Sequence, residues 1–138
     1  LSEVMRSGKK PKSDLSEIKN NHDLLEIIKT LEPFRLVLFR AGLIIDKSVI
    51  DTGVKILNIH AARVPDYGGI GSIQKALRDE AFEQCASLHI VTSKIDDGEV
   101  VDTEDFILDP QSSYFQNESI AYQAAIKLLI RSLQSSGI

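Results

Sequence analysis

The sequence predicts one α/β domain with a mainly parallel sheet between flanking helices. The apolar run 35–39 is typical of a strand buried on both faces, as in parallel sheets, and residues 55–60 follow as the next strand. Segments with helical periodicity alternate with the strands, which favours parallel pairing through crossover helices. A length of 138 residues, with 43% hydrophobic and 26% charged residues, suits a single core.

The expected elements begin with a polar arm or loop remnant over residues 1–22, followed by the α/β domain over residues 23–138. Residues 14–31 have helical spacing, and Pro33 ends that segment. Further helices are predicted over 46–52 and 72–81, and strands over 87–92, 100–101 and 106–108. The last helix is expected to turn a common face inward, formed by Tyr122, Ala125, Ile126, Leu129, Ile130 and Leu133.

Composition excludes several classes of protein. The net charge of −4 argues against a broad nucleic-acid-binding face. Cys85 is the single cysteine, so a disulfide framework is excluded and a reducing compartment is expected. The sequence shows neither a signal-peptide pattern nor an apolar stretch near 18 residues, so a cytoplasmic protein without a membrane partner is expected. One cysteine and three scattered histidines offer no metal-ligand spacing, so no metal is expected.

Asn58 and His60 are the strongest candidates for chemistry. Side chains two apart on a strand point to the same face, so this amide and this imidazole project together where the strand meets the turn 65–69. A hydrogen-bond donor and a group that titrates near neutrality are suited to reactions at a carbonyl. Asp96 stands beside a glycine turn after another apolar strand, and strand ends converge in α/β sheets.

Three stretches resemble the folate-dependent formyltransferase superfamily, over residues 23–133. Residues 36–45 (LVLFRAGLII) are similar to a family strand that ends in Ala-Gly and an apolar loop. Residues 56–69 (ILNIHAARVPDYGG) are similar to its Asn-x-His strand and Pro-x-Tyr-x-Gly turn, and 87–98 (SLHIVTSKIDDG) to its His-containing strand and Asp-x-Gly turn. The resemblance implies a three-layer, Rossmann-like fold.

The resemblance also implies an activity, the transfer of a formyl group from 10-formyltetrahydrofolate to a primary amine of a small molecule. Asn58, His60 and Asp96 fall on the family's catalytic residues, and His89 falls on a strand histidine close to the site. The positions that fall on the wall around the folate pterin are Leu43, Ile44, Ile45, Val91, Thr92, Ile95 and Asp96.

The chain departs from the family in three places, the first of which is Glu99, which stands where many members have Pro. Arg40 occupies a position that is usually apolar, and the family's N-terminal strand with its Gly-rich turn has no match here, since Gly8 is the only glycine before Gly42. Either the residues belong to a longer protein or the amine site is built differently. Two alternative functions therefore remain, a formyltetrahydrofolate hydrolase and a non-catalytic folate-binding remnant. The identity of the acceptor, including tRNA, and the formation of a homodimer are also left open.

Overall fold

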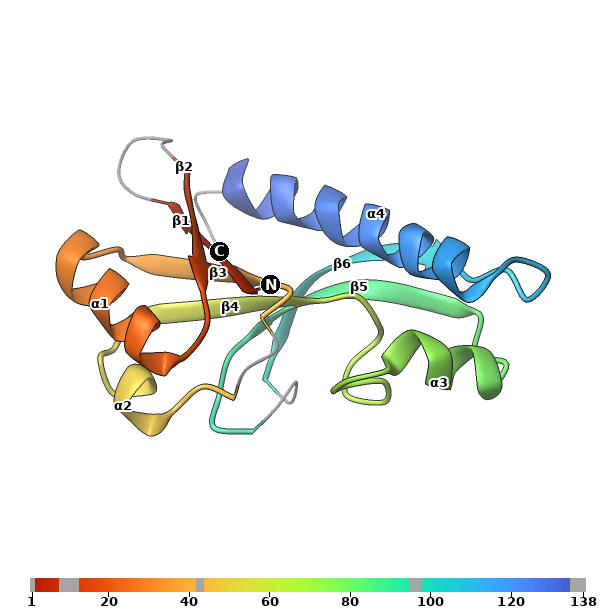
Figure 1. Ribbon diagram of the computed structural model, residues 1–138, viewed down its shortest axis with the longest axis horizontal. Coiled ribbons are helices and arrows are strands. Elements are labelled where there is room, and N and C mark those ends of the chain that lie inside the picture. The colour runs from red at the N-terminus through yellow and green to blue at the C-terminus, as the bar shows by residue number, and fades with distance from the viewer. Residues whose placement is uncertain (1, 8–12, 42–43, 95–97, 135–138) are drawn as a thin grey trace.

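The structure is a computed structural model of the chain. It describes residues 2–7, 13–41, 44–94 and 98–134, with side chains from residue 17 onward. The strands are β1 (Ser2–Ser7), β2 (Ser13–Ile18), β3 (Arg35–Phe39), β4 (Lys55–His60), β5 (Glu83–Ile90) and β6 (Val100–Ile107). The helices are α1 (Asn21–Leu31), α2 (Lys47–Ile50), α3 (Ser72–Arg78) and α4 (Tyr114–Gln134). The described strands form one sheet in the order β2-β1-β3-β4-β5-β6 (Figure 1).

The α/β class with flanking helices is confirmed, but the expectation of a mainly parallel sheet is wrong. Of the described strand pairs, β3 with β4 is parallel, and the others are antiparallel. A continuous apolar run reports that a strand is buried on both faces. It does not report the direction of the neighbouring strand, and a central antiparallel strand such as β5 is buried to the same extent.

The N-terminal segment also differs from the expected polar arm over residues 1–22. Its strands β1 and β2 pair antiparallel with each other, and β1 pairs antiparallel with the edge of β3. These strands form because their backbones hydrogen-bond to an otherwise open sheet edge. A hydropathy pattern does not predict such pairing. The extension by β1 and β2 places β3 inside the sheet rather than at its border.

The sheet separates two apolar clusters, and successive residues of β3 alternate between them. Val37 and Phe39 belong to the larger cluster, together with residues of α3 and α4. Leu36 and Leu38 belong to the smaller cluster, together with residues of α1 and the loop before α2. Helices thus cover both faces in three layers, with α4 running along β5 and β6 and α1 and α2 lying together at the other end of the sheet (Figure 1).

Several element bounds differ from the prediction. Helix α1 begins only at Asn21, because the Asn20 side chain accepts a hydrogen bond from the Asp23 amide, 2.9 Å away, and caps it. Strand β5 begins at Glu83 rather than residue 87, and β6 is one strand where two were predicted. None of the helices in the described segments combines the length and apolarity that a membrane span requires.

Candidate active site

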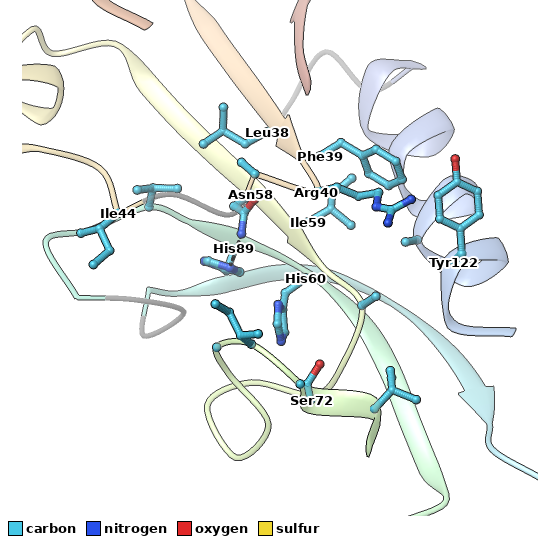
Figure 2. Close-up of a pocket in the computed structure, with 18 of the residues that line it drawn as sticks. Leu38, Phe39, Arg40, Ile44, Asn58, Ile59, His60, Ser72, His89 and Tyr122 are labelled. Atoms are coloured by element: carbon cyan, nitrogen blue, oxygen red, sulfur yellow. Dashed lines mark hydrogen bonds between the residues drawn. The ribbon is translucent and has the colours of Figure 1, made fainter. Parts of the chain in front are cut away.

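Asn58 and His60 share one face of β4, at the end of the strand. Leu57 and Ile59 alternate with them and pack into the cluster beneath α4, whereas Ile56 packs into the opposite cluster. Asn58 and His60 follow Ile56 on that second face, where both side chains are half-buried. The predicted side-by-side arrangement of the amide and the imidazole is therefore what the structure shows (Figure 2).

His89 lies directly across the sheet from Asn58. The two residues are register partners in the antiparallel pair of β4 and β5, and Asn58 Nδ2 lies 3.3 Å from His89 Nε2. Because the amide nitrogen can only donate, Nε2 is the acceptor, and the ring proton sits on Nδ1, 3.4 Å from the Ile90 carbonyl oxygen. Asn58 Oδ1 is buried and meets no hydrogen-bond partner within the described part of the chain. An unpartnered buried oxygen beside a cavity is available to a ligand.

His60 is held by the turn that follows β4. Its Nε2 lies 2.7 Å from the Tyr67 carbonyl oxygen, so Nε2 carries a proton and donates it there. The Tyr67 hydroxyl in turn donates to Asp79 Oδ2, 3.3 Å away. Partial desolvation, and then the Asp79 carboxylate, raises the pKa of the Tyr67 phenol, so this hydroxyl stays a donor at neutral pH. The turn 65–69 therefore fixes the imidazole from its backbone.

A cavity of about 930 Å³ opens where β3 and β4 end, and residues from both faces of the sheet line it. Asn58, His60 and His89 line it near its centre, and Ile44 lies on the opposite side from Arg40 and Tyr122 (Figure 2). Of the residues predicted to form the pterin wall, those that line the cavity are Ile44, Ile45, Val91 and Thr92. The predictions for Leu43, Ile95 and Asp96 lie outside the described residues. No three His, Cys, Asp or Glu side chains gather as metal ligands would in the segments that the structure describes.

Asn21 holds the loop that carries Ile44. Its Nδ2 donates to the Ile44 carbonyl oxygen and its Oδ1 accepts from the Asp46 amide, both at 2.8 Å. One side chain thus ties two backbone groups of this cavity wall to the first turn of α1. Ile44 itself is 61% exposed, so its position depends on this backbone restraint more than on core packing. Sequence reasoning missed Asn21, because nothing in its local pattern distinguishes it from an ordinary residue at a helix start.

Gly98 supports the same region from the other side. A β-carbon at this position would run into the backbone carbonyl of Ile90, the residue that follows His89. The Ile90 amide also donates to the Glu99 carbonyl oxygen, 2.9 Å away, and the β5–β6 ladder shifts register between Leu88 and His89. The position after Asp-x in the Asp-x-Gly motif therefore requires glycine because two backbones approach closely there.

Tyr122 is a cavity residue that the sequence pattern misassigned. It was predicted on the inward face of the last helix, but it is 37% exposed and lines the cavity. Ile130, on the same predicted face, is 51% exposed. The buried face of α4 is rotated towards its small residues, which are Ala121, Ala124 and Ala125, and these allow close packing on the sheet.

Sequence comparison relates the chain to proteins of one class. Residues 7–132 match the formyl transferase family. A methionyl-tRNA formyltransferase from Sulfurihydrogenibium sp. is 32% identical over 85 residues, which are 61% of this chain and 27% of that protein. One from Neisseria meningitidis is 27% identical over 125 residues, covering 88% of this chain and 41% of that protein. The chain thus spans less than half the length of these relatives.

Solved structures show a common fold. Phosphoribosylglycinamide formyltransferase from Streptococcus pneumoniae superposes with a TM-score of 0.72 at 20% identity, covering 83% of this chain and 66% of that one. Glycinamide ribonucleotide transformylase 1 from Geobacillus kaustophilus gives 0.72 at 22% identity, covering 82% and 61%. The Rossmann-like fold expected from the sequence is confirmed by these neighbours. With the family match extending over most of its length, the chain belongs to the formyl transferase family.

Proposed function

We propose that the chain transfers a formyl group from 10-formyltetrahydrofolate to a primary amine. The observation that carries the proposal is the pairing of Asn58 and His60 on one strand face, inside a cavity with an apolar wall. An amide donor and an imidazole, held next to space for a flat ligand, suit reaction at a formyl carbon. Membership of the formyl transferase family supports this choice.

The pterin of the folate is proposed to lie against Ile44, Ile45 and Val91. These side chains give a flat heterocycle an apolar surface, and Thr92 begins the segment whose backbone would pair with its polar edge. Leu43, Ile95 and Asp96 are proposed to complete this wall. The folate then brings the activated carbon, and the protein supplies alignment and dipoles.

Asn58 is proposed to stabilise the tetrahedral intermediate. When the amine attacks the formyl carbon, negative charge builds on the carbonyl oxygen, which the second hydrogen on Asn58 Nδ2 can meet. One hydrogen of this nitrogen is already directed at His89 Nε2, 3.3 Å away, which fixes the direction of the other. A donor of this kind is worth about 10²–10³ in rate.

His60 is proposed to take the proton from the attacking amine. Because Nε2 donates to the Tyr67 carbonyl oxygen, the lone pair of the neutral ring lies on Nδ1, the nitrogen that would act as the base. General acid–base help contributes about 10²–10⁴ in rate. Asp96 is proposed to orient His60 and stabilise its charged form, or to order a water that relays the proton.

The acceptor is proposed only as a primary amine. The relatives are named for methionyl-tRNA and for phosphoribosylglycinamide, which differ greatly in size. For either acceptor, formyl transfer requires only an amine that can approach the folate above Asn58 and His60.

Calorimetric titration with 5-formyltetrahydrofolate, a stable folate, tests the first half of the proposal. Binding by the wild type that weakens at least tenfold in Asp96→Ala, but not in Asp105→Ala, is the expected result. Asp105 is the matched control because it is an exposed carboxylate on β6 that lies outside this cavity. A folded wild type that does not bind would refute the proposed pocket.

Turnover of 10-formyltetrahydrofolate tests the second half. Release of tetrahydrofolate is expected to depend on an added amine and to fall about 10²–10³-fold in Asn58→Ala. Equal release without any amine would assign a hydrolase instead. Folate binding without turnover under any amine would assign a binding module.

A further inference from the structure

Arg40 adopts a backbone conformation that turns its side chain towards α4. Strand β3 ends at Phe39, and Arg40 follows with a φ of 57°, in the left-handed region that residues other than glycine rarely adopt. Neighbouring side chains of an extended strand point to opposite faces. Here both instead reach Tyr122: the Phe39 ring contacts it edge-on at 5.8 Å between centroids, and the Arg40 guanidinium carbon lies 5.3 Å from its centroid.

The guanidinium of Arg40 is available to a ligand. Within the described segments, no carboxylate pairs with it, and it makes no hydrogen bond. Glu118, a carboxylate that lines the same cavity, accepts its hydrogen bond from the Tyr114 hydroxyl instead. Contact with an aromatic ring does not pair the guanidinium N–H groups with an acceptor oxygen, so they can still donate to a ligand. Such a fork matches the oxygens of a phosphate or carboxylate.

The position of Arg40 relative to the proposed reaction centre selects the ligand. Figure 2 shows Ile44 on one side of Asn58 and His60, and Arg40 with Tyr122 on the other. A folate whose pterin covers the Ile44 wall, with its formyl group at Asn58, leaves the Arg40 side open to the attacking amine. We propose that Arg40 forms an anion subsite, in which it binds a phosphate or carboxylate carried by the amine acceptor.

This inference rests on the proposed function for the identity of the ligand, but the subsite can be tested separately. The glutamate carboxylates of the folate are the other source of an anion with this chemistry. If Arg40 binds these folate carboxylates, removing Arg40 should weaken folate binding. If Arg40 binds the acceptor instead, folate binding should be unchanged.

The test compares two primary amines that differ by one phosphate. The ¹⁵N-labelled chain is titrated by nuclear magnetic resonance with O-phosphoethanolamine and with ethanolamine, and 5-formyltetrahydrofolate is titrated by calorimetry. The wild type is expected to bind O-phosphoethanolamine at least tenfold more tightly than ethanolamine, with shifts at the Tyr122 amide. Charge-assisted hydrogen bonds are worth about tenfold to a hundredfold in affinity.

Arg40→Gln is expected to remove the preference for the phosphate and to leave folate affinity within twofold. Arg40→Lys keeps the charge without the planar fork and is expected to retain part of the preference. Arg78→Gln is the matched control, because Arg78 is an exposed arginine on α3 that does not line the cavity. If Arg40→Gln does not fold, Tyr122→Leu, which removes the ring beneath the guanidinium, is expected to weaken O-phosphoethanolamine binding severalfold.

The subsite is refuted if the wild type binds the two amines equally, or if Arg40→Gln keeps the preference. A loss of folate affinity in Arg40→Gln, with O-phosphoethanolamine binding unchanged, would assign Arg40 to the folate instead. Arg40-dependent binding of O-phosphoethanolamine by a chain that does not bind folate would support the subsite and refute the proposed function.

Discussion

The two faces of β4 differ in composition from the middle of the strand onward. On the α4 side, Leu57 and Ile59 are almost fully buried in the larger cluster. On the α1 side, Ile56 packs into the smaller cluster, but Asn58 and His60 follow it as half-buried polar residues. One face of this strand therefore contributes to the stability of the core, and the other carries the candidate catalytic residues. Substitutions at neighbouring positions should then separate the two properties.

Leu57→Ala is expected to have the largest effect, on stability. The leucine is fully buried, so its truncation removes apolar contacts and leaves a cavity that the surrounding sheet cannot fill. The free energy of unfolding, measured by urea denaturation, should fall by about 2–5 kcal/mol. Folate affinity of the remaining folded protein should stay within severalfold of the wild type. A loss below about 1 kcal/mol would contradict the assignment of this face to the core.

Asn58→Ala is expected to give the opposite result at the next position. Turnover should fall about 10²–10³-fold, because the proposed oxyanion donor is lost. The free energy of unfolding should change by no more than about 1 kcal/mol, since losing the His89 hydrogen bond is offset by removing the unpartnered Oδ1. Circular dichroism and denaturation, run beside the kinetics, check this. A stability loss as large as that of Leu57→Ala would show that the two faces do not divide as described.

Asn21→Ala tests whether the loop carrying Ile44, which Asn21 holds in place, shapes the cavity. The change removes two hydrogen bonds to the backbone of residues 44 and 46, and should lower the free energy of unfolding by about 1–2 kcal/mol. It should also weaken 5-formyltetrahydrofolate binding severalfold. Asn20→Ala is a matched control, because it removes the cap of the same helix at a cost of about 1 kcal/mol without touching the cavity wall. Equal folate affinity in both variants would contradict the proposed role of the Ile44 loop.

Arg131→Gln on the α4 side is expected to have a smaller effect than the three substitutions above. Its guanidinium donates to Asp102 and Glu104 on β6, with nitrogen–oxygen distances of 2.7 and 2.9 Å. Because the arginine side chain is 44% exposed, the variant should lose at most about 1 kcal/mol at neutral pH. Arg78→Gln, which removes a more exposed pair with Asp79, should lose nothing measurable.

The loss in Arg131→Gln should depend on pH in a defined direction. The hydrogen bond from Arg131 lowers the pKa of Asp102 below its usual value. A carboxyl with a lowered pKa in the folded state stabilises the protein above its unfolded pKa of about 3.9, and this contribution disappears as pH falls through the folded pKa. The difference between wild type and variant should therefore shrink in denaturation curves recorded at acidic pH. A difference that grew on acidification would contradict the assigned ion pair.

The sequence predicts the central strands and the candidate site better than the periphery. Strands β3 and β4 were predicted with the bounds that the structure has, because their apolar runs are set by local burial. Asn58 and His60 could be placed on one face because the side-chain repeat of a strand is fixed by its geometry. The strands at the N-terminus and the direction of β5 depend on long-range backbone pairing, for which single-sequence patterns carry no signal.

The cavity shows the same limit of sequence reasoning at the level of side chains. The family resemblance predicts a folate wall that includes Ile44, Ile45, Val91 and Thr92, and these residues do line the cavity. Asn21 and Tyr122 were missed, since their roles come from contacts with segments far away in the sequence. The catalytic role of Asp96 stays a prediction.

The close approach at Gly98 has a consequence for sequence variation. A side chain of any kind at this position meets the backbone of Ile90, which cannot rotate away as a neighbouring side chain could. In a library carrying every amino acid at each position and selected for folded protein, position 98 should therefore retain glycine alone. Position 53, where glycine has a φ of 79° and an open surrounding, should also accept asparagine. Two glycines that look alike in the sequence should thus differ sharply in the number of alleles that they tolerate.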